Sequence, residues 1–283
     1  MTETETSQKT CIALLQMTSG IDPLVNAQTL TDAVRDAADG GAAMLFTPEM
    51  SGLLDRQRTR SAERIVEEAE DVVLAAVRNA AAQHHIWVAL GSLAIKRFDG
   101  RLANRSLLIT PQGNIAARYD KIHMFDVELS SGESWKESAA YVPGEDIVTA
   151  ETPVGRLGLA VCYDIRFPAL FDELGHKACD CIAIPAAFTV PTGKAHWHLL
   201  QRARAVEASA YVISAAQVGK HADGRETYGH SLVVDPWGEI VLDMGGEKAG
   251  LGFAEIDHGR IREIRSQIPS LANRRVLPKA MTP

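Results

Sequence analysis

The sequence lacks long apolar runs, and none approaches the roughly 20 residues that a membrane helix requires. Residues 1–10 are polar and rich in Thr and Glu. They have neither the basic start nor the apolar stretch of a secretory signal. We therefore expect a flexible N-terminal tail at 1–10, a single domain at 11–283, a cytoplasmic protein and no membrane contact.

Positive charge is also low. The chain has 29 Lys and Arg against 36 Asp and Glu, which gives a formal net charge of -7 at pH 7. Nucleic-acid binders need a basic surface to displace counterions, and proteins that dock electrostatically on acidic membranes need one too. The charge balance disfavours both classes, so no nucleic-acid partner is expected.

Cysteine is scarce as well, with four residues in 283. They are Cys11, Cys162, Cys179 and Cys181. In a cytosolic chain of this size, free thiols are more common than a disulfide framework. No Cys or His pair has the spacing of a zinc site, and His196 and His198, two residues apart, lie on different faces of a helix. We expect neither a metal site nor a cofactor.

Two common catalytic motifs are missing too. Thr-Gly-Lys at 192–194 lacks the upstream glycine of a phosphate-binding loop, and no Gly-x-Ser-x-Gly elbow occurs. No linker rich in Pro, Ser or Gly divides the chain. These absences disfavour a P-loop nucleotide site, a serine-hydrolase elbow and a tandem pair of separate domains.

What the sequence does contain is an alternation of strand-like and helix-like segments. Helical spacing is clear over residues 23–39, which a Gly-Gly pair ends, and over residues 63–83. Further helices are expected near Ala169 and over residues 196–209. The expected strands are 12–16, 43–47, 86–93, 106–110, 115–119, 157–161, 181–184, 211–218, 231–234 and 240–243.

The second half of the chain repeats the order of the first. Ser-Leu-Leu-Ile-Thr-Pro-Gln-Gly-Asn-Ile from residue 106 aligns without gaps with Ser-Leu-Val-Val-Asp-Pro-Trp-Gly-Glu-Ile from residue 231. Such self-similarity indicates two related halves. The strands are apolar throughout, so each sheet should be buried on both faces. We predict an α/β fold, a four-layer α-β-β-α sandwich.

Cys162 is the candidate nucleophile. It follows the strand-like run Leu-Gly-Leu-Ala-Val and precedes Tyr-Asp-Ile-Arg-Phe-Pro. Folds of the α/β class place reactive groups where strands end, and the polar Asp164 and Arg166 indicate that the apolar layer has ended here. The other three cysteines are interpreted as packing residues.

A cysteine nucleophile needs a base, and a hydrolase needs a group that holds the oxyanion. Glu49 stands just past the buried run Ala-Ala-Met-Leu-Phe, a position suited to a general base and acid. Lys121, in a polar and aromatic stretch, would supply a fixed positive charge. Solvated surface positions are the alternative interpretation of both residues. A Cys-His dyad also stays open, because none of the nine histidines has a spacing that singles it out.

Three segments together resemble a known family. Pro-Glu-Met at 48–50, Tyr-Asp-Lys-Ile-His-Met-Phe-Asp at 119–126 and Cys-Tyr-Asp-Ile-Arg-Phe-Pro at 162–168 are similar to the three catalytic blocks of the nitrilase superfamily, in the family's order. The similarity runs from about Ile12 to Arg275. It implies that residues 11–283 form one carbon-nitrogen hydrolase domain with a nitrilase-like fold.

The resemblance also implies roles for individual residues. Glu49 would be the general base, Lys121 the oxyanion stabiliser and Cys162 the nucleophile of a cysteine-dependent amidohydrolase. A second catalytic glutamate usually lies between the lysine and the cysteine; Glu137 has the matching place, and Glu133 is the fallback. The family further implies a homodimer or a higher homo-oligomer.

Four more segments narrow the resemblance to one branch. The blocks at 185–197, 201–207, 215–217 and 228–231 are similar to deaminated glutathione amidases, with the omega-amidases of 2-oxo acid amides as the nearest relatives. The reaction implied is hydrolysis of a primary amide to the acid and ammonia through a cysteine thioester. His198 departs from the branch, which usually has a glutamate there.

Three residues near the expected nucleophile are candidates for substrate binding. A backbone N–H near Tyr163 would help to hold the oxyanion, Arg166 suits a substrate carboxylate, and Thr189 would add a hydroxyl donor. An ion pair between Arg166 and Asp164 is the structural alternative. The expected ligand is a small-molecule amide. Action on 2-oxoglutaramate, on nitriles or on N-carbamoyl compounds stays open, as does a non-catalytic binding module.

Overall fold

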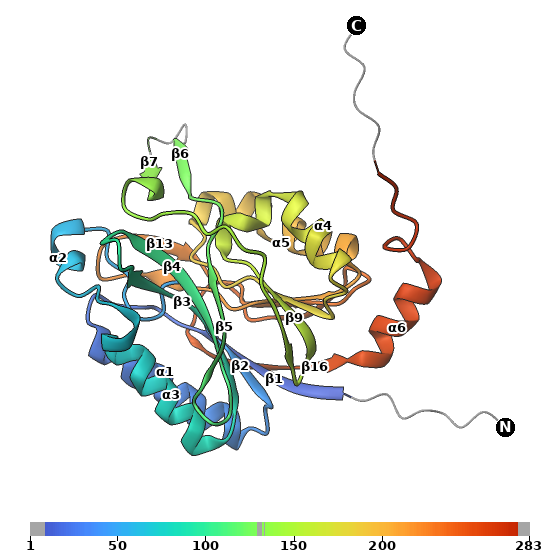
Figure 1. Ribbon diagram of the computed structural model, residues 1–283, viewed down its shortest axis with the longest axis horizontal. Helices are drawn as coiled ribbons and strands as arrows, with labels where there is room; N and C mark the ends of the chain where they lie inside the picture. The colour runs from blue at the N-terminus through green and yellow to red at the C-terminus, as the bar shows by residue number, and fades with distance from the viewer. Residues whose placement is uncertain (1–8, 129–131, 133, 277–283) are drawn as a thin grey trace, which may run out of the picture.

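Apolar strands and amphipathic helices stack into layers in the computed structural model, which describes residues 9–128, 132 and 134–276 (Figure 1). The first sheet has six strands in the order β16-β1-β2-β3-β4-β5. Strands β1, β2 and β3 are mutually parallel, and the others are antiparallel to their neighbours. The strands span Lys9–Gln16 (β1), Met44–Phe46 (β2), Trp87–Lys96 (β3), Leu102–Ile109 (β4), Ile115–Asp120 (β5) and Gly250–Asp257 (β16).

The second sheet has the same plan, with the strand order β15-β14-β11-β10-β9-β8. Its strands span Thr149–Thr152 (β8), Gly155–Leu159 (β9), Cys181–Ala183 (β10), Tyr211–Ser214 (β11), Leu232–Val234 (β14) and Ile240–Asp243 (β15). Two small sheets are added by Asp126–Glu128 (β6) with Ser134–Lys136 (β7), and by Val218–Lys220 (β12) with Glu226–Tyr228 (β13).

The two large sheets confirm the internal repeat. Strands β1, β2, β3, β4 and β5 have β9, β10, β11, β14 and β15 as their counterparts, and each series ends in the predicted antiparallel hairpin. Each sheet also gains one antiparallel strand beside the first of its series, β16 in one and β8 in the other.

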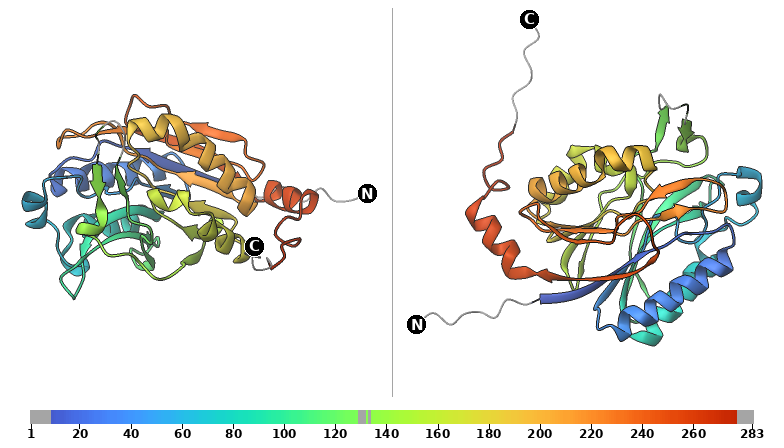
Figure 2. Two further views of the ribbon diagram at one scale, coloured as in Figure 1. Left: turned by 90° about the horizontal axis from the view of Figure 1, so that it is seen from above. Right: turned by 180° about the vertical axis from the view of Figure 1, so that it is seen from behind.

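Helices cover the outer faces of both sheets. Pro23–Asp39 (α1) and Val72–His84 (α3) lie on the first sheet, and Pro168–His176 (α4) and Val190–Ala208 (α5) lie on the second (Figures 1 and 2). This arrangement confirms the predicted four-layer α-β-β-α sandwich. The remaining helices are Arg58–Ala62 (α2), His258–Gln267 (α6) and the short 3-10 turns Glu68–Glu70 (η1), Glu137–Ala139 (η2) and Cys162–Arg166 (η3). No helix in the described ranges is long and apolar enough to span a membrane.

Strand β1 shows why its sheet is apolar on both faces. Ile12 and Leu14 belong to the core that includes the second sheet, whereas Ala13 and Leu15 pack with the side chains of α1 and α3. Side chains alternate across a strand, so a strand between two layers must be apolar at every position.

Two predicted helices begin elsewhere. The helix expected over residues 63–83 starts at Val72, because the Asp71 side chain accepts a hydrogen bond from the Leu74 N–H and caps the helix there. The helix expected from residue 196 starts at Val190. Pro191 occupies its first turn, where a residue without an N–H loses no intrahelical bond.

Two other boundaries were also wrong. The strand expected over 211–218 ends at Ser214. Lys9 and Thr10, assigned to the flexible tail, pair with Asp257 and Ile256 as part of β1. Residues 1–8 of that predicted tail lie outside the described residues.

Candidate active site

Glu49 lies just beyond the carboxyl end of β2. The chain there passes close to Gly91 of β3: a Cβ at Gly91 would lie 1.9 Å from the Thr47 carbonyl oxygen, so this approach requires glycine. The Gln217 side-chain amide donates to the Glu49 carbonyl oxygen at 3.0 Å. Only 5% of Glu49 is exposed. The first sheet therefore holds this carboxylate in a fixed, buried position.

Lys121 directly follows β5. Strand alternation buries both Tyr119 and Lys121 and turns Asp120 away from them, where the Arg105 guanidinium donates to it at 2.7 Å. Lys121 is only 2% exposed. A lysine is rarely buried to this degree without a charged partner. Here the partners are the carboxylates of Glu49 and Glu137.

Cys162 begins the turn η3 after the strand β9. Its φ of +48° falls in the left-handed region, where a residue with a side chain costs about 1–3 kcal/mol and which is common at functional sites. The Cys162 N–H donates to the Pro185 carbonyl oxygen at 2.9 Å, which fixes the turn against the end of β10. The strained turn places the Cys162 thiol just beyond the carboxyl end of β9 in the second sheet.

These three residues meet between the two sheets. Lys121 Nζ lies 3.0 Å from Glu49 Oε1, and Glu49 Oε2 accepts the Ala187 N–H at 2.9 Å. The Cys162 thiol lies close enough to the Glu49 carboxylate for that carboxylate to raise the pKa of the thiol. The structure therefore brings Glu49, Lys121 and Cys162 together, as the sequence predicts, and it gives the thiol a carboxylate rather than a histidine as its partner.

The charges of this group determine which proton is mobile. Burial raises the pKa of the Cys162 thiol well above its ordinary value and Glu49 raises it further, against the opposing effect of Lys121. Burial alone lowers the pKa of Lys121, but Glu137, Glu49 and Cys162 outweigh it and hold the pKa well above its ordinary value. Cys162 is therefore a thiol at rest, and Lys121 is an ammonium group.

Glu137 completes the buried charge cluster. Its Oε2 lies 2.8 Å from Lys121 Nζ and accepts the Phe125 N–H at 2.7 Å. Glu137 is thus a second glutamate in contact with Lys121. The fallback, Glu133, lies outside the described residues.

Asn104 of β4 is a site residue that the sequence analysis missed. Its side-chain Nδ2 donates to Glu49 Oε1 at 2.9 Å and to Glu137 Oε1 at 3.1 Å. It bridges the two acids on either side of Lys121. The available signal was a buried amide inside an otherwise apolar strand, because a buried polar group requires partners.

A second buried network supports the nucleophile turn, and it was also missed. Asp164, fully buried, accepts hydrogen bonds from the Tyr119 hydroxyl at 2.7 Å and from the Val161 N–H at 2.8 Å. It also accepts from the His123 N–H at 3.0 Å and pairs with His123 Nδ1 at 2.7 Å. The acid two residues after Cys162 therefore ties η3 to the segment that follows β5.

Two of the expected substrate-binding residues, Tyr163 and Thr189, differ in whether their donor group already has a partner. The Tyr163 ring packs edge-on against Phe125, and its N–H lies in the first turn of η3, where helices leave donors without an intrahelical acceptor. Thr189 precedes α5, and its hydroxyl is already 2.9 Å from the Thr192 hydroxyl. Thr189 is therefore less available to a substrate than predicted.

Arg166 lies over two aromatic rings. Its guanidinium carbon is 5.8 Å from the centre of the Tyr163 ring and 5.5 Å from that of Phe188, and its Nη1 is 3.3 Å from His196 Nδ1. The alternative ion pair with Asp164 is not formed, since that carboxylate is bound to Tyr119 and His123. Arg166 thus retains a cationic group for an anionic ligand.

The other three cysteines are free thiols, as expected. Cys179 and Cys181 are fully buried, and burial raises the pKa of Cys179 to about 12. Such thiols are poor nucleophiles at neutral pH. His198, the departure from the branch pattern, is hydrogen-bonded to Asp243 at 2.9 Å rather than to any residue of the buried charge cluster.

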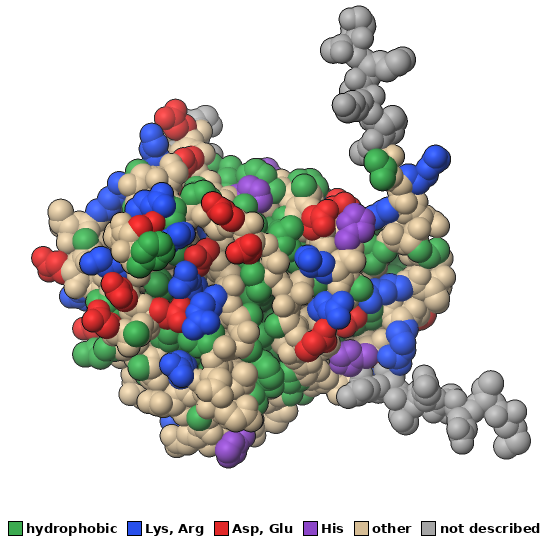
Figure 3. All heavy atoms as spheres, viewed as in Figure 1, with side chains coloured by type: hydrophobic (Ala, Val, Ile, Leu, Met, Phe, Trp, Pro, Cys, Tyr) green, Lys and Arg blue, Asp and Glu red, His purple; other side chains and the backbone are tan. Residues whose placement is uncertain are grey.

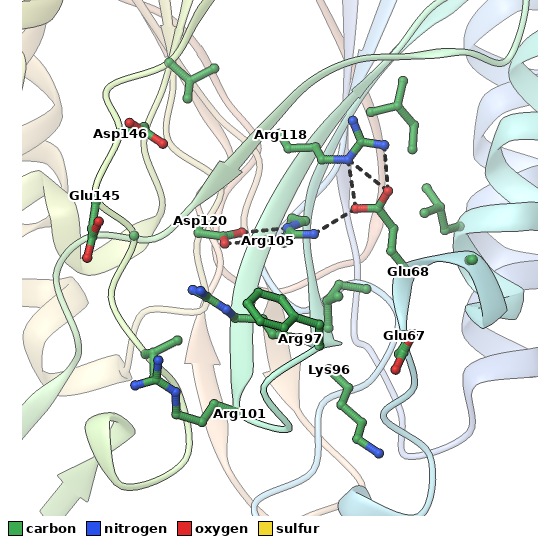
Figure 4. Close-up of a pocket in the computed structure, with 18 of the residues that line it drawn as sticks. Glu67, Glu68, Lys96, Arg97, Arg101, Arg105, Arg118, Asp120, Glu145 and Asp146 are labelled. Carbon is green, nitrogen blue, oxygen red and sulfur yellow. Dashed lines mark hydrogen bonds and ion pairs between the residues drawn. The ribbon is translucent and has the colours of Figure 1, made fainter.

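A cavity of about 990 Å³ lies elsewhere, beside β4 and β5. Its lining contains none of Glu49, Lys121 and Cys162. Inside it, Arg105 binds Asp120 and Glu68, so its charges largely neutralise one another (Figure 4). Acidic and basic side chains are likewise interspersed on the face shown in Figure 3. The surroundings of Cys162 are therefore a better candidate for the reaction site than this polar cavity.

Comparison with known proteins agrees with this geometry. The chain matches the carbon-nitrogen hydrolase family over residues 11–266. It is 37% identical over 267 residues to the deaminated glutathione amidase of Yersinia enterocolitica. The aligned region covers 93% of this chain and 92% of that protein.

Solved structures show the same fold. The C. elegans NitFhit protein superimposes with a TM-score of 0.88 at 35% identity, over 95% of this chain and 66% of that one. A mutant amidase from Nesterenkonia sp. AN1, which carries the acetamide moiety of fluoroacetamide on its active-site cysteine, superimposes with a TM-score of 0.81 at 26% identity, over 96% and 95% of the two chains. By the family match and the Yersinia relative, the chain belongs to the carbon-nitrogen hydrolase family.

Proposed function

We propose that this protein hydrolyses the side-chain amide of a small 2-oxo-acid-type substrate to the carboxylate and an amine, with deaminated glutathione as the foremost candidate. From deaminated glutathione the leaving amine is cysteinylglycine, whereas the primary amide of 2-oxoglutaramate releases ammonia. The observation that carries the proposal is the burial of Cys162 close to the ion pair of Glu49 with Lys121, both of which influence the pKa of the thiol. Relatives named deaminated glutathione amidase, matched over nearly the whole chain, support the choice of substrate.

The first half of the proposed reaction forms a thioester. Cys162 Sγ attacks the amide carbon while Glu49 takes the thiol proton, as the raised pKa of the thiol requires. Lys121 and the Tyr163 N–H stabilise the oxyanion; one such donor is typically worth about 3–4 kcal/mol. The carbon–nitrogen bond then breaks, and Glu49 returns its proton to the departing amine, which is cysteinylglycine from deaminated glutathione and ammonia from a primary amide.

The second half reverses these roles. Glu49 takes a proton from water as the water oxygen attacks the thioester carbon. The carbon–sulfur bond breaks, and the proton held by Glu49 returns to sulfur. Glu137 and Asn104 would keep Lys121 and Glu49 in place through both halves, because each contacts at least one of them.

Arg166 would select the substrate by its carboxylate. The flanking rings of Tyr163 and Phe188 restrict the guanidinium and reduce its exposure to water, which strengthens an ion pair. A carboxylate near the scissile amide is common to deaminated glutathione and 2-oxoglutaramate. Arg166→Gln should therefore lower kcat/KM for both substrates to a similar degree.

The test compares release of 2-oxoglutarate, the acid that both deaminated glutathione and 2-oxoglutaramate yield, with release of ammonia from a nitrile and from an N-carbamoyl amino acid. We expect the highest kcat/KM with deaminated glutathione. Cys162→Ala should abolish turnover, whereas Cys11→Ala, Cys179→Ala and Cys181→Ala should retain it. Full activity of Cys162→Ala would overturn the mechanism. A preference for 2-oxoglutaramate would overturn the substrate assignment alone, and His198→Glu would then be the first variant to measure.

We further propose a cytoplasmic homodimer or higher homo-oligomer. The free state of all four cysteines supports a reducing compartment. Large apolar side chains are exposed on α5 and on the β14–β15 hairpin, a feature typical of protein interfaces; these are Leu199, Val206, Trp237, Ile240 and Val241. Sedimentation of the full chain as a monomer at micromolar concentration would contradict the oligomer.

A further inference from the structure

Three side chains far apart in the sequence converge away from Cys162. His198 lies on α5, His230 shortly precedes β14, and Asp243 ends β15. Asp243 Oδ2 is 2.9 Å from His198 Nε2, and Asp243 Oδ1 is 2.9 Å from His230 Nδ1. Because the three residues are far apart in the chain, local spacing in the sequence gives no sign of this cluster.

Surrounding groups hold the side chains of this cluster in place. The Gly245 N–H donates to Asp243 Oδ1 at 2.9 Å, and the Tyr228 ring stacks on the His230 ring with a centroid separation of 4.4 Å. The backbone at His230 is fixed as well, because the Trp197 indole N–H donates to its carbonyl oxygen at 2.9 Å. Such support by neighbouring groups is typical of metal ligands.

The geometry suits a small divalent ion. One atom from each residue lies within 4.8 Å of the others, and ligands at about 2.0–2.2 Å from a tetrahedral zinc lie roughly 3.3 Å apart. Small side-chain rotations would therefore admit an ion. The side chains of His198 and Asp243 are each 30% exposed and that of His230 is 23% exposed, which leaves an entry path and room for a water ligand.

We propose that His198, His230 and Asp243 form a binding site for a divalent transition-metal ion, zinc foremost, with water completing the coordination. Two imidazoles and one carboxylate match the ligand preference of zinc. The site does not rest on the proposed amidase function, and it contributes no group to the Cys162 reaction. The proposal differs from the sequence expectation of no metal site by adding one non-catalytic site.

A second group of possible ligands provides a contrast. Asp172, Glu173 and His176 are all exposed on one helix, α4, and His176 Nδ1 is 3.7 Å from each acid. Exposed i,i+3 and i,i+4 pairs of this kind are common and weak. His176 therefore serves as the matched control.

The experiment measures zinc binding to chelator-treated full-length protein by competition with a chromophoric chelator. The Cys162→Ala background is used because the active-site thiol is itself a potential zinc ligand. We expect one equivalent of zinc per chain, with affinity lost by at least about tenfold in each of His198→Ala, His230→Ala and Asp243→Asn, and unchanged in His176→Ala. Unchanged binding in His198→Ala, or no binding before the mutations, would overturn the site.

Cobalt absorption gives an independent readout. A tetrahedral Co²⁺ site should produce visible d–d bands in the Cys162→Ala protein and in His176→Ala, but not in His198→Gln. Circular dichroism of His198→Gln establishes that it is folded, so that lost bands report lost ligation. Bands of equal strength in His198→Gln would contradict the assignment.

Discussion

The Lys121 ammonium group lies between the carboxylates of Glu49 and Glu137, and it lowers the pKa of the Cys162 thiol. Its charge therefore influences which groups of the buried charge cluster hold protons. With Glu49 and Glu137 ionised, the ammonium group balances only one of the two negative charges. A thiolate at Cys162 would add a further negative charge in a buried place. The residues therefore favour a neutral thiol that loses its proton to Glu49 only during attack.

This distribution predicts the pH dependence of alkylation. Because the folded pKa of Cys162 lies well above its ordinary value, iodoacetamide labelling should rise at a higher pH than labelling of free cysteine, which titrates near about 8.5. Peptide mass spectrometry after timed labelling measures the rate at this site, with N-acetylcysteine as the reference. An inflection below pH 7 would instead indicate a preformed thiolate ion pair.

Asn104 offers a second prediction at this scale. Asn104→Ala removes the donor shared by Glu49 and Glu137, and hydrogen bonds to charged groups contribute about 1.5–3 kcal/mol. We expect kcat to fall roughly ten- to a hundredfold, as measured by release of the product acid. The control is Asn114→Ala, in the exposed turn before β5. Equal kcat in Asn104→Ala and the unmodified protein would exclude a role in positioning the acids.

At the scale of elements, each proposed catalytic side chain stands where a strand ends. Glu49 follows β2, Lys121 follows β5 and Cys162 closely follows β9. Strand ends are readable from apolar runs, which made these positions candidates, and the resemblance of three segments to the nitrilase blocks then supplied their expected roles. The buried partners Asn104 and Asp164 could not be predicted, because their function depends on which distant groups they contact and sequence spacing contains no such information.

Element boundaries show the same limit. The start of α3 depends on one cap by Asp71, and that of α5 on the tolerance of a helix for Pro191 in its first turn. A local side-chain hydrogen bond outweighs the periodic pattern at such places. The order of elements was predictable because it follows from periodicity over many residues.

The turn η3 yields a prediction of its own. In Asp164→Asn, an amide group replaces one acceptor oxygen among several buried donors, so the free energy of unfolding should fall by about 1–3 kcal/mol together with kcat. Thermal unfolding measures the stability, and release of the product acid measures kcat. Tyr119→Phe removes a single donor and should have the smaller effect. Wild-type activity and stability in Asp164→Asn would show that this network does not hold the nucleophile.

For the whole molecule, the two halves contribute unequally to one site. Glu49 and Lys121 come from the first sheet and its hairpin, whereas Cys162 and the Ala187 N–H come from the second. The two halves therefore share the arrangement of their strands but contribute different side chains and backbone groups to the site. The family branch could be read from local motifs, but the meeting of His198 with Asp243 required the folded chain.

Catalysis by this arrangement should need no metal. Dialysis against a strong chelator is expected to leave kcat unchanged, because the proposed reaction uses a thiol, a carboxylate and an ammonium group. Total metal is measured alongside the rate, so that removal from the His198 cluster is verified. Activity that falls on chelation and returns with stoichiometric zinc would contradict a metal-independent reaction.

The pairing of β1 with β16 has a consequence during synthesis. Lys9 of β1 pairs with Asp257 of β16, so about 250 residues must be synthesised after Lys9 before β1 can pair with β16. At roughly 5–20 residues per second, the ribosome needs about 12–50 s to make them. Over that interval the apolar segment Cys-Ile-Ala-Leu-Leu exposes an unpaired strand edge, a template for aggregation. The nascent chain is therefore expected to need a chaperone most just before its last strand emerges.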